Sequence, residues 1–459
     1  MADASATGST VIFLVSVALS LVVLGYRWER LPALRRGVDR LRERLTGEPD
    51  WSWLRLWHVL LPLVVVTAIN VGWNVAYVHC SDDSLAILAS GQAALHGHDP
   101  FLVNYCSGAT PDQIPYGTAE VALNALAAVS GSVAAVWLLW QLLALAVVPL
   151  VWYVGGSDRR YLSVLAATSV TYLPNIATNI GVENAIVPVS ILVMLLALRS
   201  PGSRRPALTA LAAFLSTARF PAAFPVLGAT AGAPRDRLRL AALVVGVFAG
   251  SVLLGYALWG WNAIHIVYLN QFSRVPGESL NVFALLLHER WVAPSLAVAA
   301  VQGGGILLLV LWVHVRRYSP AAAAALPILG VMSLTQYLTF HFVVWLVPLV
   351  LLGARVNRGL FLYATLTWVD ETIFSWNLGA VHGLWGPYEV TGVLLSLLLA
   401  YLIVRIVLDE EARRSGRAPA GSAGERSDLP GLEPAAANRA VPASNGVGRD
   451  GVEPSTSAL

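Results

Sequence analysis

The sequence predicts an all-α, polytopic membrane protein with a bundle of about 13 transmembrane helices, several of them short, and a long first outer loop. Two observations lead to this fold class. Hydrophobic residues make up 56% of the chain and charged residues only 12%, about half the charged share of a typical soluble domain. The apolar residues are gathered in repeated runs of about 16 to 24 residues, which is the length range of membrane-spanning helices.

The N-terminal part, residues 1–26, is expected to be a transmembrane anchor with its apolar span at Val11–Tyr26. Its length and the lack of an A-x-A site after it favour a retained anchor over a cleaved signal peptide. Residues 27–53 begin with a run of seven arginines, Arg27–Arg44, with apolar residues at helical spacing. This pattern predicts a basic amphipathic segment on the cytoplasmic membrane face, which places Met1 outside by the positive-inside rule.

Residues 54–408 form the expected membrane domain, in which arginine-rich segments mark every second turn as cytoplasmic. The predicted spans are Leu54–Val78, Ser132–Val154, Tyr161–Pro174, Ile186–Leu198, Ala207–Ser216, Pro221–Thr230, Leu240–Trp261, Val292–Val315, Ala321–Phe340, Phe342–Leu352, Gly359–Phe374 and Glu389–Leu408. Short paired spans can stop part-way only where their polar tips line a cavity or are buried in protein. The pattern therefore predicts a cavity open to the outer side, and residues 409–459, poor in large apolar residues, are predicted to be a disordered cytoplasmic tail.

The first outer loop, Val78–Tyr116, is the longest polar interruption between two strongly apolar spans. It contains the acidic pair Asp82 and Asp83, which either keeps a helix end in water or serves chemistry at the membrane surface. It also contains both cysteines of the chain, Cys80 and Cys106. Because the arginine pattern places the loop outside, where disulfides persist, we expect the two cysteines to be bonded; two free thiols are the alternative.

Three arginines depart from the cytoplasmic bias: Arg219, Arg274 and Arg290. Arginines near bilayer depth are costly, face a cavity and usually meet an anion. One interpretation is a phosphate clamp at the outer surface of the membrane. The alternative is an internal ion pair, for example between Arg290 and Glu289 or between Arg274 and Glu278.

Acidic residues also gather on the predicted outer side, and such a carboxylate could act as a general base on a hydroxyl. They are Asp82, Asp83, Asp112, Glu120, Glu183, Glu278, Asp370 and Glu371. His341 could hydrogen-bond to a substrate, although a lone histidine at a helix turn is more often structural, and Glu183 with Asn184 could simply cap a helix.

The net charge of +3 does not indicate binding to nucleic acid. No P-loop, dinucleotide fingerprint or zinc spacing occurs, so we expect no cofactor and no metal.

Several short segments, taken in order, carry a resemblance to a known family. They are Asp83 followed by Gly97–Phe101, Ile114–Gly117, Asn179–Asn184, Thr217–Pro221, Asn270–Ser273 and Gln336–Pro348. In order and in shared outer placement they resemble the multi-spanning GT-C glycosyltransferases, especially the polyprenyl-phosphate-mannose-dependent mannosyltransferases of actinobacteria. The resemblance covers roughly residues 54–408, and Glu183 departs from the family's Gly-Gln-x-Asn turn.

This resemblance implies an inverting glycosyltransferase at the outer face of the plasma membrane. Asp83, or else Asp82, would deprotonate a hydroxyl of a lipid-linked or glycan acceptor, which would attack the anomeric carbon of a polyprenyl-phosphate sugar, by resemblance mannose. Arg274, with Arg219, would stabilise the departing phosphate. The further substrate-binding residues would be Glu183, Asn184, Asn270, Gln271 and His341.

Two alternatives fit the same charges. A lipid or solute transporter would use midplane charges as a relay, and Asp370 and Glu371 would then matter most. A non-catalytic scaffold for envelope assembly would use the acids and the arginines only to pair with each other.

Overall fold

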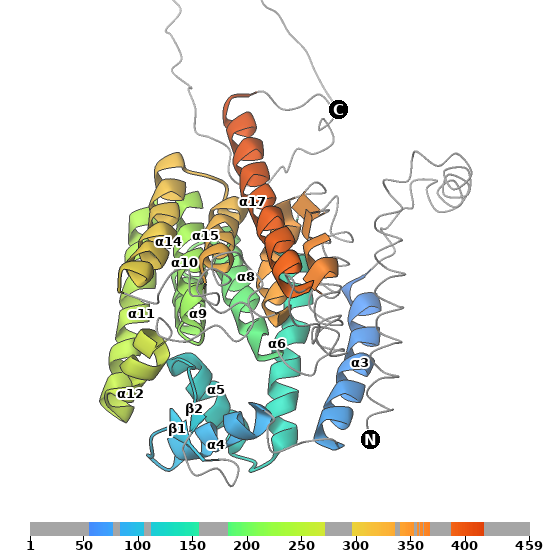
Figure 1. The fold of residues 1–459 in the computed structure, drawn as a ribbon, viewed down its shortest axis with the longest axis vertical. Helices are drawn as coiled ribbons and strands as arrows, with labels where there is room; N and C mark the ends of the chain where they lie inside the picture. Colours follow the sequence, from blue (N-terminus) through green and yellow to red (C-terminus); the bar gives the residue numbers. More distant parts are fainter. Residues whose placement is uncertain are drawn as a thin grey trace, which may run out of the picture.

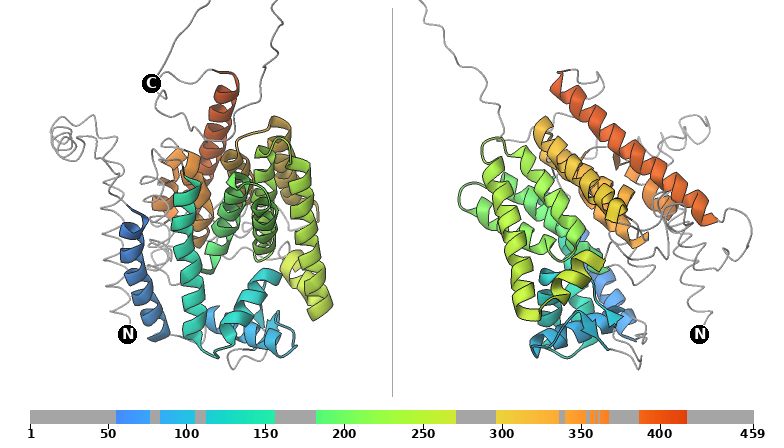
Figure 2. Two further views of the ribbon diagram at one scale, coloured as in Figure 1. Left: turned by 180° about the vertical axis from the view of Figure 1, so that it is seen from behind. Right: turned by 60° about the vertical axis from the view of Figure 1, so that its left-hand side comes forward.

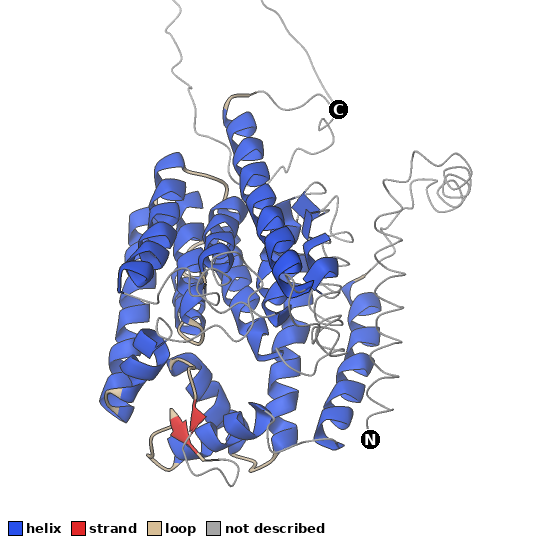
Figure 3. Ribbon diagram, in the orientation of Figure 1, coloured by secondary structure: helices blue, strands red, loops and turns tan. Residues whose placement is uncertain are grey.

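The part of the chain that the structure describes is almost entirely helical, which confirms the predicted all-α class (Figure 3). This computed structural model describes residues 55–76, 83–104, 112–155, 182–270, 296–335, 340–352 and 387–416, together with short stretches between 356 and 367. A single two-stranded antiparallel sheet occurs within them, with Leu102 paired to Gln113 and Val103 to Asp112.

The elements follow one another in a helical chain interrupted once by the small sheet (Figure 1). They are α3 (Leu56–Ala76), α4 (Asp83–Leu95), β1 (Leu102–Val103), β2 (Asp112–Gln113), α5 (Thr118–Ala128), α6 (Val133–Val154), η4 (Val182–Ala185), α8 (Ile186–Arg199), α9 (Arg204–Ser216), η5 (Phe220–Ala222), α10 (Ala223–Ala229), η6 (Thr230–Gly232), α11 (Arg237–Trp259), α12 (Asn262–Ile264), η7 (His265–Leu269), α14 (Leu296–Arg316), α15 (Pro320–Leu334), η9 (Phe340–Leu352) and α17 (Pro387–Arg414).

Four helices are long and apolar enough to cross a membrane: α3, α6, α11 and the Gly392–Arg414 part of α17. Six further apolar helices are shorter, at 10–17 residues. Four of the predicted spans therefore have the length of a membrane crossing among the described residues, and the predicted count of thirteen is not reached there. The spans predicted at Val11–Tyr26 and Tyr161–Pro174 lie outside the described residues.

Helix ends follow local sequence signals. Ser132 caps α6 by accepting a hydrogen bond on its hydroxyl from the backbone N–H of Ala134, at 3.2 Å. Helix α11 ends at Gly260, whose φ of 74° is in the left-handed region that glycine adopts without steric cost. These signals agree with the predicted span boundaries to within a few residues.

The centre of the bundle consists of α8, α15 and η9, which are buried on almost every side. A helix that is apolar all round belongs in such a position. Close packing is possible because small residues lie where helices meet. A Cβ atom on Gly228 of α10 would come within 2.3 Å of the carbonyl oxygen of Ala323 on α15.

The two ends of the bundle differ. Helices α4 and α5 with the small sheet form a layer at one end, which we call the cap (Figures 1 and 2). The C-terminal end of α17 lies at the opposite end. There, Arg205 pairs with Asp236 at 3.0 Å, and the guanidinium of Arg237 donates to the carbonyl oxygen of His314 at 3.4 Å.

We call this opposite end the arginine-rich end, because most arginines of the described residues precede, begin or end its helices. They are Arg199, Arg204, Arg205, Arg235, Arg237, Arg239, Arg316, Arg317, Arg413 and Arg414. Arg219, in contrast, lies in the turn between α9 and α10 beside the cap.

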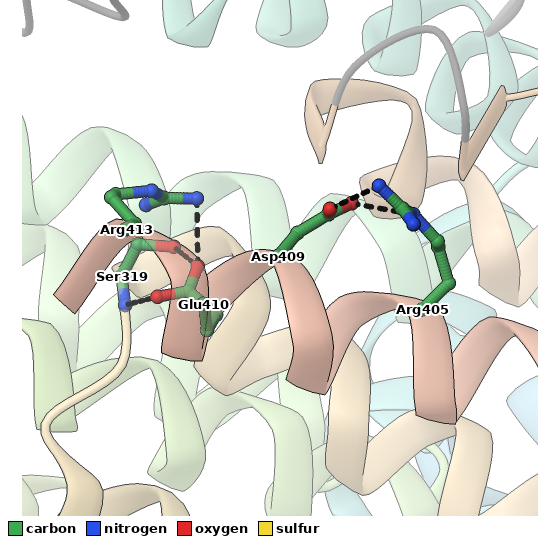
Figure 4. Close-up of polar contacts among 5 residues, drawn as sticks. All are labelled: Ser319, Arg405, Asp409, Glu410 and Arg413. Carbon is green, nitrogen blue, oxygen red and sulfur yellow. Dashed lines mark hydrogen bonds and ion pairs between the residues drawn. The ribbon is translucent and has the colours of Figure 1, made fainter. Parts of the chain in front are cut away.

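The last helix is fixed to the turn between α14 and α15 by carboxylates (Figure 4). Glu410, nearly fully buried, accepts hydrogen bonds from the hydroxyl of Ser319 at 2.6 Å and from its backbone N–H at 3.2 Å, and pairs with Arg413 at 2.9 Å. One turn earlier, Arg405 pairs with Asp409. Helix α17 thus continues to Arg414, beyond position 409 where the composition placed the start of the tail.

Candidate functional site

The cap contains the described part of the first outer loop, which begins at Asp83. Asp83 is the first residue of α4, so its backbone is fixed at a helix N-terminus within the cap. Glu183 lies in η4 and His341 in the first turn of η9, on the bundle side. Five of the predicted site residues lie outside the described residues: Asp82, Arg274, Gln271, Cys80 and Cys106.

Arg219 forms a two-point ion pair with Glu120 of α5. Its Nε lies 3.0 Å from Glu120 Oε2, and its Nη2 donates to Glu120 Oε1 at 3.3 Å. The guanidinium carbon also lies 3.9 Å from the ring centroid of Tyr116, a cation–π contact. The Glu120 side chain is fully buried and that of Arg219 is only 14% exposed. The internal ion pair, one of the two interpretations of Arg219, is therefore present.

The backbone brings the two partners together through a close contact at Gly117. Its N–H donates to the carbonyl oxygen of Ala218 at 2.9 Å, and a Cβ atom there would lie 1.7 Å from the carbonyl oxygen of Thr217. The hydroxyl of Thr217 in turn accepts the N–H of Ala119 at 3.2 Å. These contacts dock the start of α5 on the turn between α9 and α10, so that Arg219 meets Glu120.

A second attachment joins the cap to the segment after α11. Asp99 accepts hydrogen bonds from the N–H of Phe101 at 2.9 Å and from Asn262 Nδ2 at 2.5 Å. Phe101 packs edge-to-face on Trp259, with ring centroids 5.9 Å apart. Asn270, predicted to bind substrate, donates from its Nδ2 to Gln113 Oε1 at 2.5 Å, on an exposed part of the surface. The structure thus places Asn270 beside the cap, where its side chain is hydrogen-bonded to Gln113 of β2.

Asn184 lies away from these contacts in a buried position. Its Oδ1 accepts a hydrogen bond from Trp345 Nε1 at 3.1 Å, which joins η4 to η9. Buried polar groups are usually bonded in this way, so this contact gives Asn184 a structural role in the bundle.

Tyr268 of η7 is a further residue near the ion pair that sequence reasoning missed. Its ring packs edge-to-face on Phe220, with centroids 5.6 Å apart, and its hydroxyl lies 3.4 Å from where a Cβ of Gly117 would be. The hydroxyl oxygen is buried and has no hydrogen-bond partner within the described ranges. Burial raises the pKa of Tyr268 above its ordinary value.

The cap side therefore holds one carboxylate, one guanidinium and two phenols, Glu120, Arg219, Tyr116 and Tyr268, around the start of α5. Such a set can fix the position of the cap on the bundle. In the part of the chain that is described, no three His, Cys, Asp or Glu side chains are grouped so that they could hold a metal ion.

The fold and these contacts define an all-α chain with four helices able to cross a membrane and a polar cap at one end. Comparisons with protein-family models, with curated proteins and with solved structures find no match for this chain.

Proposed function

We propose that the protein is an inverting glycosyltransferase of the plasma membrane that transfers a sugar, by resemblance mannose, from a polyprenyl-phosphate donor to a lipid-linked or glycan acceptor at the outer face. The acceptor hydroxyl loses its proton to Asp83 and its oxygen attacks the anomeric carbon. The bond from that carbon to the phosphate oxygen breaks, and the polyprenyl phosphate leaves with the electron pair.

The opposite chemical character of the two ends is the observation that carries the proposal. The helix that Asp83 begins lies at the end of the bundle away from the arginine-rich end. The positive-inside rule assigns the arginine-rich end to the cytoplasm and so the cap to the outer side. A sugar donor on a polyprenyl anchor in the outer leaflet presents its phosphate at the outer membrane surface, on the same side as the cap.

Asp83 begins α4 within the cap, on the side that the positive-inside rule assigns to the outer face, and this place supports its assignment as the base. We assign the leaving phosphate to Arg274. Arg219 pairs with Glu120 through a hydrogen bond from Nη2 and a close approach of Nε, so its main part in this proposal is to hold the cap against the bundle.

A non-catalytic scaffold is the second candidate, because the Arg219–Glu120 pair is the kind of internal pairing that it predicts. The transporter alternative depends on Asp370 and Glu371, which lie outside the described residues.

The test is sugar transfer in isolated membranes supplied with radiolabelled polyprenyl-phosphate mannose. Asp83→Asn should abolish transfer, because an amide cannot accept the proton, while expression stays normal. Asp236→Asn removes a carboxylate at the arginine-rich end and serves as the matched control with transfer retained. Loss only in Asp82→Asn would move the role by one residue. Transfer in both loop variants would refute the mechanism, and no transfer by the wild type would favour the scaffold.

A further inference from the structure

The arginine-rich end carries a group of exposed arginines that the fold does not use. Arg204, Arg235, Arg239 and Arg317 are all exposed, and within the described ranges none of them has a hydrogen-bond or ion-pair partner. By contrast, Arg413 and Arg414 at the tip of α17 are paired with Glu410 and Glu411.

These arginines lie in or next to the ends of three helices, α9, α11 and α14, that are joined to one another there. Asp236 precedes α11 and pairs with Arg205 of α9 at 3.0 Å, which brings the starts of α9 and α11 together. Arg237 donates to the carbonyl oxygen of His314 at 3.4 Å, which joins the start of α11 to the end of α14. Asp236, which follows Arg235 in the chain, is thus already paired with Arg205, and Glu411 is paired with Arg316 and Arg414, so the group keeps an excess of positive charge.

Apolar side chains are exposed directly beside these charges. Leu238 is 75% exposed between Arg237 and Arg239, and Val315 is 77% exposed next to Arg316. Large apolar side chains with this exposure fit contact with acyl chains, while guanidinium groups match phosphate oxygens in a two-point geometry. The surface therefore offers apolar and anion-binding parts close together in the chain, since Leu238 adjoins Arg239 and Val315 precedes Arg317 by two residues.

The backbone of Arg317 has an uncommon conformation. Its φ of 53° lies in the left-handed region, where a residue with a Cβ is sterically disfavoured and glycine is the usual choice after a helix end. The chain instead presents an exposed guanidinium at this turn, which is consistent with a role for the side chain itself.

We propose that Arg204, Arg235, Arg239 and Arg317 form a binding surface for anionic phospholipid headgroups, with the acyl chains against Leu238 and Val315. We call it the lipid surface. It is separate from the cap and does not depend on the proposed sugar transfer. A juxtamembrane arginine attracts an anionic leaflet strongly enough to change affinity about fivefold.

The experiment uses the full chain, purified in neutral detergent and stripped of lipid. Phosphatidylglycerol or phosphatidylcholine is titrated in, and thermal unfolding is followed by tryptophan fluorescence. Phosphatidylglycerol should raise the unfolding midpoint at lower concentrations than phosphatidylcholine, and 0.5 M salt should weaken this difference because exposed charges are screened at about that ionic strength.

Two double variants remove the same charge from different places. Arg235→Gln with Arg239→Gln should raise the half-saturating phosphatidylglycerol concentration by about 25-fold, from about fivefold for each arginine. Arg413→Gln with Arg414→Gln, at paired positions, should change it far less. Arg235→Lys with Arg239→Lys keeps the two charges but not the two-point geometry, and its half-saturating concentration should lie between those of the wild type and the glutamine variant.

Three results would overturn the proposal. The first is an equal response to both lipids. The second is an equal loss in both double variants, which would indicate a general effect of charge. The third is an equal stabilisation by millimolar inorganic phosphate alone, which would assign the arginines to a soluble anion.

Discussion

Removing one partner of the Arg219–Glu120 pair should destabilise the protein unequally, depending on which charge is left behind. Arg219→Ala leaves the fully buried Glu120 carboxylate without this counter-charge, and breaking a buried pair in this way costs about 3–5 kcal/mol. Glu120→Ala leaves a guanidinium that is 14% exposed and still lies on the ring of Tyr116, so we expect a smaller loss of about 2 kcal/mol.

The assay is a double-mutant cycle on the free energy of unfolding in mixed micelles. The Arg219→Ala, Glu120→Ala double variant should be more stable than the sum of the two single losses predicts, with an interaction energy of about 1–3 kcal/mol. Replacement of both residues by methionine should recover more stability still, since a buried ion pair can often be exchanged for apolar packing. Additive single losses, or a larger loss in Glu120→Ala than in Arg219→Ala, would refute the reasoning.

Three further predictions concern other contacts. Gly117→Ala should cost about 3 kcal/mol or more in unfolding free energy, because its Cβ would lie 1.7 Å from a carbonyl oxygen. Gly246→Ala in α11, with no atom within 4 Å, is the matched control and should stabilise by about 0.5–1 kcal/mol. Burial, and then the hydrogen bond that Tyr318 donates to Glu411 of α17, raise the pKa of Tyr318 above its value in the unfolded chain. The neutral phenol therefore stabilises the folded protein at neutral pH, and this stabilisation is lost as the pH rises above about 10. Tyr318→Phe should therefore lower the unfolding midpoint at pH 7, and the gap to wild type should shrink at pH 11; a constant gap would contradict this. Cys80 and Cys106, outside the described residues, should appear as a disulfide worth about 3–4 kcal/mol, and two alkylated thiols in non-reduced protein examined by mass spectrometry would exclude the bond.

The long apolar helices could be predicted from the sequence because their signal is local. The span predicted at Leu54–Val78 is observed as Leu56–Ala76, and the one at Ser132–Val154 as Val133–Val154. Length and hydropathy decide such segments, and flanking polar residues set their ends. Helix α5 was not predicted, because its eleven residues are too few and too mixed to give a membrane signal.

The contacts of the candidate site could not be predicted in the same way. Glu120 was recognised as one of several outer acids and Arg219 as a misplaced arginine, but 99 positions separate them. Their pairing depends on the close backbone contact at Gly117, which is a three-dimensional property that no local pattern encodes. Asp99 and Asn262 meet across 163 positions for the same reason.

The 3₁₀ conformation of η9 changes what its length means. A 3₁₀-helix rises about 2.0 Å per residue, so the 13 residues of Phe340–Leu352 extend about 26 Å, whereas an α-helix of the same residues would extend about 20 Å. The hydrocarbon layer of a bilayer is about 30 Å thick. By residue number η9 falls among the segments too short to cross, yet its stretched winding reaches most of that thickness. Counting residues therefore underestimates how deep this segment can reach, and its two ends can approach opposite surfaces of the membrane.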